Sequence, residues 1–172
     1  LAYLYWDFDK PSLIAPLYVF STKEKDHELL IEHTVSFYRT GNELLTIQIN
    51  NGSYEEVNII LHDYPSLEIK NQFVTPILSM YSSLVIPHVD YNEKDNAFYV
   101  ILPKESGILD SYNKGFELVS LSRNSEPRIL MEQIENRPIK VSPDGKFALF
   151  GHQLEQLIDF QANSVVELVN VQ

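Results

Sequence analysis

Residues 117–125 read ELVSLSRNS, and residues 156–164 read QLIDFQANS. The two stretches align without a gap, and the second starts 39 residues after the first, at 156 against 117. A further apolar pair follows each stretch at the same spacing, Ile129-Leu130 in one copy and Leu168-Val169 in the other. Apolar residues, a polar turn and apolar residues again predict a β-hairpin in both copies. A period of about 40 residues is typical of repetitive β architecture, in which each unit buries its apolar side against a neighbour.

The rest of the chain is also rich in strand signals. Residues 45–49 alternate apolar and polar side chains, which predicts a half-buried strand. Asn51-Gly52 follows and favours a two-residue hairpin turn, because both residues readily adopt positive φ. For residues 72–80 we expect strand rather than helix, and for residues 131–136 a single helical turn.

The last part of the chain resembles a known repeat. Residues 141–147 read VSPDGKF, in which Pro143 presets φ for a tight turn and Gly145 tolerates positive φ. The strands LIDF at 157–160 and VELV at 166–169 follow. This order resembles one blade of a β-propeller of the WD-repeat or TolB-like kind, most clearly over residues 139–170. The resemblance implies four antiparallel strands per blade.

We therefore predict an all-β fold of antiparallel blade-like hairpin repeats, either a small β-propeller or a related twisted-sheet fold. The prediction is one domain over residues 1–172, with blade-like units at approximately 13–61, 62–132 and 137–172. At about 40 residues a blade, the length admits at most four blades. A four-bladed propeller, part of a larger propeller and a compact twisted-sheet protein are all compatible with this pattern.

Composition limits the possible partners and chemistry. Asp and Glu number 24 against 13 Lys and Arg, for a net charge of −11, which disfavours nucleic acid and anionic membrane surfaces. No apolar run reaches the roughly 18 residues that a membrane-spanning helix needs. The chain has no cysteine, which excludes disulfides, thiolate nucleophiles and zinc–thiolate sites. It begins with Leu1 rather than methionine, and we favour a periplasmic or exported location over a cytoplasmic one.

Motifs for catalysis are lacking in the sequence. It has no G-x-S-x-G elbow and no glycine-rich phosphate loop. His62-Asp63 and His88 with Asp90 offer a general base with its orienting carboxylate, or half of a metal site. Each pair adjoins a proline, however, which favours turn residues with a structural role. We predict no enzyme activity, no metal and no cofactor.

Acidic turns that contain tyrosine are the better functional candidates, because tyrosine anchors interfaces and carboxylates attract a basic partner. The predicted partner-binding residues are Tyr54, Glu55, Glu56, Asp90, Tyr91, Glu93 and Asp95. In size, charge and texture the chain is similar to small bacterial immunity proteins, which block the active site of a cognate toxin enzyme. The predicted function is non-catalytic binding of a basic protein, as an inhibitor or immunity protein. The alternatives are a propeller scaffold or part of a larger TolB-like assembly, and a hydrolase or carbohydrate-binding protein.

Overall fold

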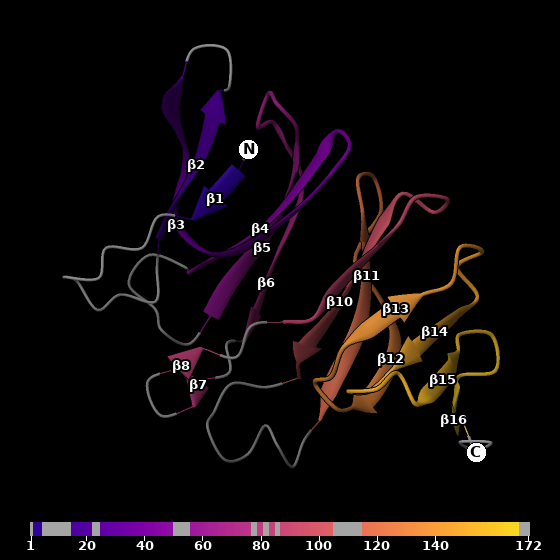
Figure 1. Ribbon diagram of the computed structural model, residues 1–172. Helices are drawn as coiled ribbons and strands as arrows, with labels where there is room; N and C mark the ends of the chain where they lie inside the picture. Colours follow the sequence, from indigo (N-terminus) through magenta and orange to yellow (C-terminus); the bar gives the residue numbers. More distant parts are fainter. Residues whose placement is uncertain are drawn as a thin grey trace. The chain divides into compact units, whose positions relative to one another are not determined.

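The computed structural model describes residues 2–4, 15–21, 25–49, 56–76, 79–80, 83–84, 87–104 and 115–168. These residues form antiparallel β-sheets, and no helix occurs among them (Figure 1). None of the described residues belongs to a helix that is long and apolar enough to cross a membrane. The all-β prediction is confirmed. The chain divides into two compact units, Leu1–Ile86 and Pro87–Gln172, while the predicted blade boundaries stay a prediction.

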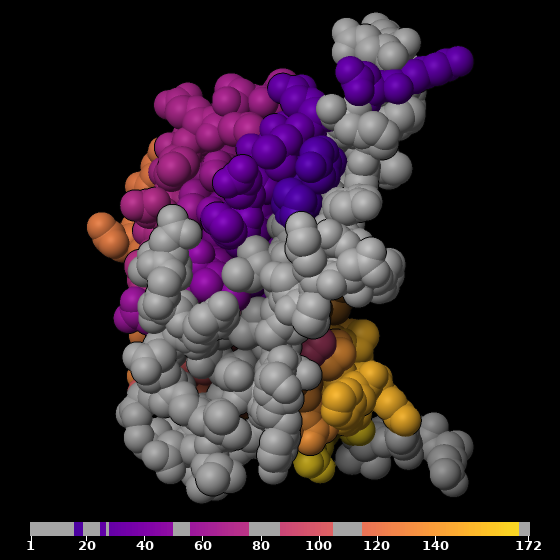
Figure 2. Space-filling view, turned by 90° about the vertical axis from the view of Figure 1, so that its left-hand side faces the viewer, coloured from indigo at the N-terminus to yellow at the C-terminus, as the bar shows by residue number. Residues whose placement is uncertain are grey.

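The first unit contains a six-stranded sheet whose strands neighbour one another in chain order. Its strands are β1 (Ala2–Leu4), β2 (Ala15–Ser21), β3 (Asp26–Thr40), β4 (Glu43–Ile49), β5 (Glu56–Asp63) and β6 (Ile69–Pro76). A separate two-stranded ladder joins β7 (Ser79–Met80) to β8 (Ser83–Leu84). In Figure 2 the described side chains of this unit form a surface that runs from indigo to magenta. The strand expected over residues 72–80 is present as β6 up to Pro76 and as β7, while Asn51-Gly52 lies outside the described residues.

Strand β3 serves two neighbours in turn. It pairs with β2 over Asp26–Thr34 and with β4 over Thr34–Thr40, so the two ladders meet at Thr34. The register against β4 shifts between Thr34 and Ser36, and His33 has a φ of +60°. A bulge of this kind bends a strand and increases its twist. The bend therefore lets β3 pair with β2 along its first half and with β4 along its second half.

Strand β4 differs from its prediction. The alternation over residues 45–49 predicts one dry face and one wet face, yet Thr46 is as fully buried as Leu45 and Ile47. The buried hydroxyl is satisfied because Thr46 Oγ1 lies 3.0 Å from His62 Nε2 and accepts a hydrogen bond from Gln48 Nε2 at 2.8 Å. Thr46 and Gln48 therefore form a hydrogen-bonded row with His62, because buried polar groups need partners.

The second unit contains two four-stranded sheets. One sheet is built of β9 (Val89–Asn92), β10 (Ala97–Pro103), β11 (Phe116–Ser122) and β12 (Arg128–Ile134). The other is built of β13 (Ile139–Val141), β14 (Phe147–Phe150), β15 (Gln156–Asp159) and β16 (Ser164–Glu167). Both are meanders in chain order. The hairpin repeat is confirmed, because its copies are the third and fourth strands of these two sheets.

The predicted helical turn at residues 131–136 is wrong, because Met131 to Ile134 belong to β12 and pair with β11. Met131 and Ile134 are both buried, and their spacing of three residues imitates one face of a helix. The spacing arises from a bulge, since the register shifts along this ladder and Gln133 has a φ of +57°. An extra residue in a bulge breaks the normal alternation of a strand.

The turn before β14 forms as predicted. The Gly145 N–H donates a hydrogen bond to the Ser142 carbonyl at 2.9 Å, and Gly145 has a φ of +71°. The Ser142 hydroxyl also accepts the Phe147 N–H at 3.0 Å, which ties the start of β14 to the end of β13. The sequence VSPDGKF thus encodes a closed local hairpin.

The two sheets of the second unit pack against each other. Register places Asp90, Asn92 and Tyr99 on one face of the first sheet. Tyr99 on this face stacks on Phe160, with ring centroids 5.8 Å apart and an interplanar angle of 17°. In the second sheet, Val141 on β13 and Ile158 on β15 lie opposite each other through Ala148, so they share one face, and both are buried. Asp90 of the first sheet accepts a hydrogen bond from the Val141 N–H. The first strands of the two sheets, β9 and β13, are in contact with each other, and the candidate site lies there.

Candidate functional site

Asp90 joins the first strands of the two sheets. Its Oδ1 atom lies 2.6 Å from Lys140 Nζ, and its Oδ2 atom accepts the Val141 N–H at 2.7 Å. The Asp90 side chain is only 11% exposed, whereas that of Lys140 is 65% exposed. A carboxylate that accepts a buried backbone N–H and an ammonium donor is strongly fixed in position. Asp90 therefore has a structural role within this unit, beyond the surface role predicted for it.

Asn92 makes a second link between the sheets. Its Nδ2 atom donates to the Ser142 carbonyl at 2.6 Å. Its Oδ1 atom accepts the N–H groups of Lys94 and Asp95, at 2.9 and 3.1 Å. One buried side chain thus organises the β9–β10 turn and attaches it to the turn after β13.

The same two turns approach closely at Asp95 and Gly145. A Cβ atom placed on Gly145 would lie 1.9 Å from Asp95 Oδ2, so only glycine fits there without a rearrangement. Asp95 Oδ2 also accepts the Tyr99 hydroxyl at 2.9 Å. Burial, and then this hydrogen bond to a carboxylate, raise the pKa of the Tyr99 phenol. Asp95 is therefore a structural acceptor as well as an acidic turn residue.

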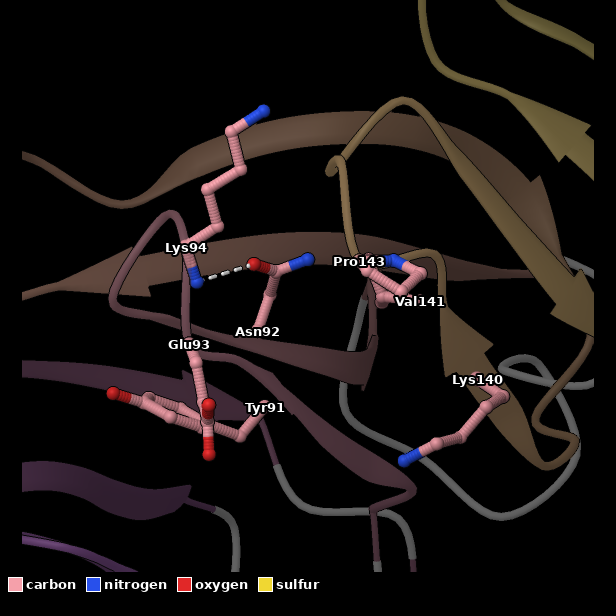
Figure 3. A pocket seen from close by; sticks show the side chains of 7 residues that line it. All are labelled: Tyr91, Asn92, Glu93, Lys94, Lys140, Val141 and Pro143. Carbon is pink, nitrogen blue, oxygen red and sulfur yellow. Dashed lines mark hydrogen bonds between the residues drawn. The ribbon is translucent and has the colours of Figure 1, made fainter.

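A cavity of about 580 Å³ lies beside these contacts (Figure 3). It is lined by Tyr91, Asn92, Glu93, Lys94, Lys140, Val141 and Pro143. Figure 3 shows Tyr91, near the end of β9, and Glu93, in the turn after it, projecting to the same side. Lys94 projects to the opposite side, and Lys140 reaches toward the cavity from β13.

The aromatic wall of the cavity is held in place. The Tyr91 ring packs on Phe98 with centroids 4.9 Å apart, and its hydroxyl donates to Asn96 Oδ1 at 2.5 Å. Glu93, in contrast, is exposed and has no ion-pair partner among the described residues. The cavity therefore combines a fixed aromatic ring with a carboxylate that is accessible to a partner.

The structure brings together only part of the predicted partner-binding set. Asp90, Tyr91, Glu93 and Asp95 all lie within the second unit around this cavity or its supporting turns. Glu56 is the exposed first residue of β5 in the first unit. Tyr54 and Glu55 lie outside the described residues.

Sequence reasoning missed the β13 side of the cavity. Lys140, Val141 and Pro143 line it, although their stretch predicts a strand and a turn only. The available signal was the repeat itself, because equivalent first strands of two neighbouring sheets are expected to lie close together.

The two histidine–aspartate pairs considered from the sequence do not form. His62 uses both ring nitrogens elsewhere, toward Thr46 and toward the Leu67 carbonyl at 3.3 Å from Nδ1. Since a carbonyl can only accept, Nδ1 carries the proton, and burial lowers the pKa of this histidine. The pKa of His88 is also lowered, by burial and then by the charge of His152. The two carboxylate oxygens of Asp90 accept hydrogen bonds from Lys140 and from the Val141 N–H.

No group of three or more His, Cys, Asp or Glu side chains suited to a metal ion is present in the part of the chain that the structure describes. Asp90 and Asp95 accept hydrogen bonds that stabilise the packing around the cavity. Glu93 is the acidic residue among those that line it.

Four-stranded meanders that pack face to face, joined at their first strands, define the chain as a β-propeller protein. The chain belongs to the family described as the YqgU-like 6-bladed beta propeller domain, whose model matches residues 1–151. The resemblance to propeller blades is thereby confirmed. The family's propeller has six blades, whereas the length of this chain admits at most four of about 40 residues.

One bacterial relative and one solved bacterial structure are similar over nearly the whole chain. The uncharacterized lipoprotein YqgU of Bacillus subtilis (strain 168) is 27% identical over 157 residues, which cover 90% of this chain and 41% of that protein. The crystal structure of the uncharacterized protein lmo1340 from Listeria monocytogenes has a TM-score of 0.80 at 20% identity and covers 98% of this chain. The chain covers 50% of that structure, so it spans about half of the length of these relatives or less.

A more distant structure shows the fold alone. The acylaminoacyl peptidase of Pyrococcus horikoshii has a TM-score of 0.56 at 13% identity, covering 92% of this chain and 29% of that one. At this identity the likeness extends to the arrangement of strands and not to the chemistry.

Proposed function

We propose that this chain is a non-catalytic, protein-binding β-propeller module of an exported protein, and that its partner contacts the cavity between β9 and β13. The observation that supports this most directly is the cavity itself, where a fixed Tyr91 ring stands beside the exposed Glu93 carboxylate. Rigid aromatic anchors with accessible charges at the rim are typical of protein-binding sites.

The partner that this surface favours is basic. The net charge of −11 attracts cationic proteins and speeds their encounter, and Glu93 offers a specific contact once they arrive. An exported location is supported by the Bacillus subtilis relative, which is named a lipoprotein. Membership of a propeller family favours the scaffold form of the hypothesis over an inhibitor.

The immunity-protein form is a sharper version of the same proposal. It requires one basic toxin enzyme whose active site is blocked by the acidic turns, with Glu93 as the exposed carboxylate at the cavity. Because Asp90 supports the packing of two sheets, a change at Asp90 does not test that version cleanly.

Affinity capture with charge-reversed variants tests the proposal. The wild-type chain, Glu93→Lys and the matched control Glu126→Lys, an exposed residue of the β11–β12 turn, are immobilised and exposed to a bacterial extract. We expect basic proteins that are retained at low salt, weakened at high salt, lost with Glu93→Lys and kept with Glu126→Lys. Identical sets on all three surfaces would contradict a site at the cavity. A single basic enzyme that loses activity when bound would support the immunity form, and several subunits of one complex would support the scaffold form.

A further inference from the structure

A second concave surface lies along the outer strands of the C-terminal unit. It is a groove of about 370 Å³, lined by Ile129–Ile134, Asn163 and Val165. β12 is the edge strand of one sheet and β16 is the edge strand of the other. Figure 1 shows both strands in the C-terminal unit, β12 in orange and β16 in yellow, and Figure 2 shows yellow side chains at the surface.

The groove runs along β12, which is the edge strand of its sheet. Successive side chains of a strand point to opposite faces, so a pocket on one face touches every second residue. Here six consecutive residues of β12, Ile129–Ile134, line the groove. The bulge that shifts the register along this strand breaks that alternation, so residues of both faces reach the groove. The edge of β12 opposite β11 has no strand partner among the residues that the structure describes. An edge of this kind offers N–H and C=O groups to an added strand.

Apolar side chains flank this edge. Ile129 is 50% exposed on β12, and Val165 is 44% exposed on β16. β-branched side chains pack well against an adjacent extended strand, and their exposure on two edge strands leaves apolar area available for burial.

Glu167 places an exposed carboxylate beside the groove. Glu167 is exposed two residues beyond Val165, and therefore on the same side of β16. No ion-pair partner of Glu167 is found among the residues that the structure describes. Glu132 on β12 already pairs with Lys104, at 2.6 Å, and Arg128 at the start of the strand is the exposed cation nearby. Together with the net charge of −11, Glu167 favours a basic side chain in the occupant.

We propose that this groove binds an extended segment of a basic partner protein, which pairs as an additional strand with the open edge of β12. Apolar side chains of the segment contact Ile129 and Val165, and a lysine or arginine contacts Glu167. Binding by strand addition draws affinity from main-chain hydrogen bonds and specificity from alternate side chains. The proposal does not depend on the cavity between β9 and β13.

Synthetic peptides test this surface directly. The probe is a fluorescein-labelled octapeptide of alternating valine and lysine, and its matched controls are the valine–glutamate octapeptide and the valine–lysine octapeptide methylated on every backbone nitrogen. Fluorescence anisotropy measures binding to the full chain. We expect the valine–lysine peptide to bind at least about fivefold more tightly than the valine–glutamate peptide. The methylated peptide should not bind, because it cannot donate to a ladder.

Two matched variants and a backbone measurement separate strand addition from non-specific attraction. Glu167→Lys should weaken binding of the valine–lysine peptide by about fivefold, because a rim attraction becomes a repulsion. Glu28→Lys changes the net charge equally at an exposed position in the first unit, and should leave the affinity within about twofold. Amide hydrogen exchange in residues 128–134 should slow on binding, while exchange in residues 89–92 stays unchanged.

Each part of this result can fail. Equal binding of the methylated peptide, unchanged exchange in β12, or equal weakening by the two variants would overturn strand addition at this groove. Absence of binding by the valine–lysine peptide would overturn it as well. Loss of binding with Glu93→Lys instead of Glu167→Lys would assign the peptide to the cavity between β9 and β13.

Discussion

Removal of the Asp90 carboxylate should destabilise the second unit. In Asp90→Ala the buried Val141 N–H loses its acceptor, which costs about 1–3 kcal/mol. The lost ion pair adds at most about 1 kcal/mol, because the Lys140 side chain is 65% exposed and water screens its charge. We expect the free energy of unfolding to fall by about 2–3 kcal/mol.

Two matched variants divide this total between the backbone and the ion pair. Asp90→Asn retains an oxygen that accepts the Val141 N–H, and should cost about 1 kcal/mol. Lys140→Met retains the Asp90–Val141 hydrogen bond and removes only the exposed ammonium, so its cost should be about 0.5 kcal/mol or less.

Urea denaturation followed by far-UV circular dichroism measures the three differences. The two compact units need not unfold together, so hydrogen exchange in residues 87–104 and 139–150 assigns the loss to the second unit. A loss below about 0.5 kcal/mol in Asp90→Ala would refute the argument that this carboxylate joins the sheets. An equal loss in Lys140→Met would show that the ion pair, and not the backbone acceptor, is the stabilising contact.

Three further predictions concern the supporting residues. Gly145→Ala should cost about 2–3 kcal/mol, because its Cβ collides with Asp95 and φ is positive, while the control Gly41→Ala meets no atom within 4 Å and should cost about 1 kcal/mol in thermal unfolding. Phe160→Ala should cost about 2 kcal/mol through loss of a half-buried stacked ring, and calorimetry that shows no change would contradict that packing. Burial lowers the pKa of His62 in the folded chain. Below about pH 6.5 the unfolded chain therefore binds more protons than the folded chain, and the free energy of unfolding decreases as the pH is lowered. Urea midpoints at pH 7.5 and 5.5 should differ less in His62→Gln than in the wild type, and an equal difference would exclude His62 as the cause.

The site was only partly predictable, because its residues have two kinds of role. Acidic turn composition singled out Tyr91 and Glu93, which line the cavity, while their role in partner binding stays a prediction. The same composition gave no sign that Asp90 accepts a backbone N–H from a strand 51 residues away. It also gave no sign that Lys140 would line the same cavity as Tyr91 and Glu93. Such pairings depend on how one sheet packs on the next, which local patterns do not encode.

The sequence by itself determined the repeated hairpins and the Ser142–Gly145 turn, because alternation and positive φ are local properties of a few adjacent residues. Tertiary structure decided what those strands bury. Thr46 is polar yet lies inside because His62 satisfies its hydroxyl, and Met131 and Ile134 imitate a helix because a bulge separates them. Only the packed sheets turned Asp90 from a surface carboxylate into a link between β9 and β13, since a buried hydrogen bond forms only where distant backbone is brought within reach.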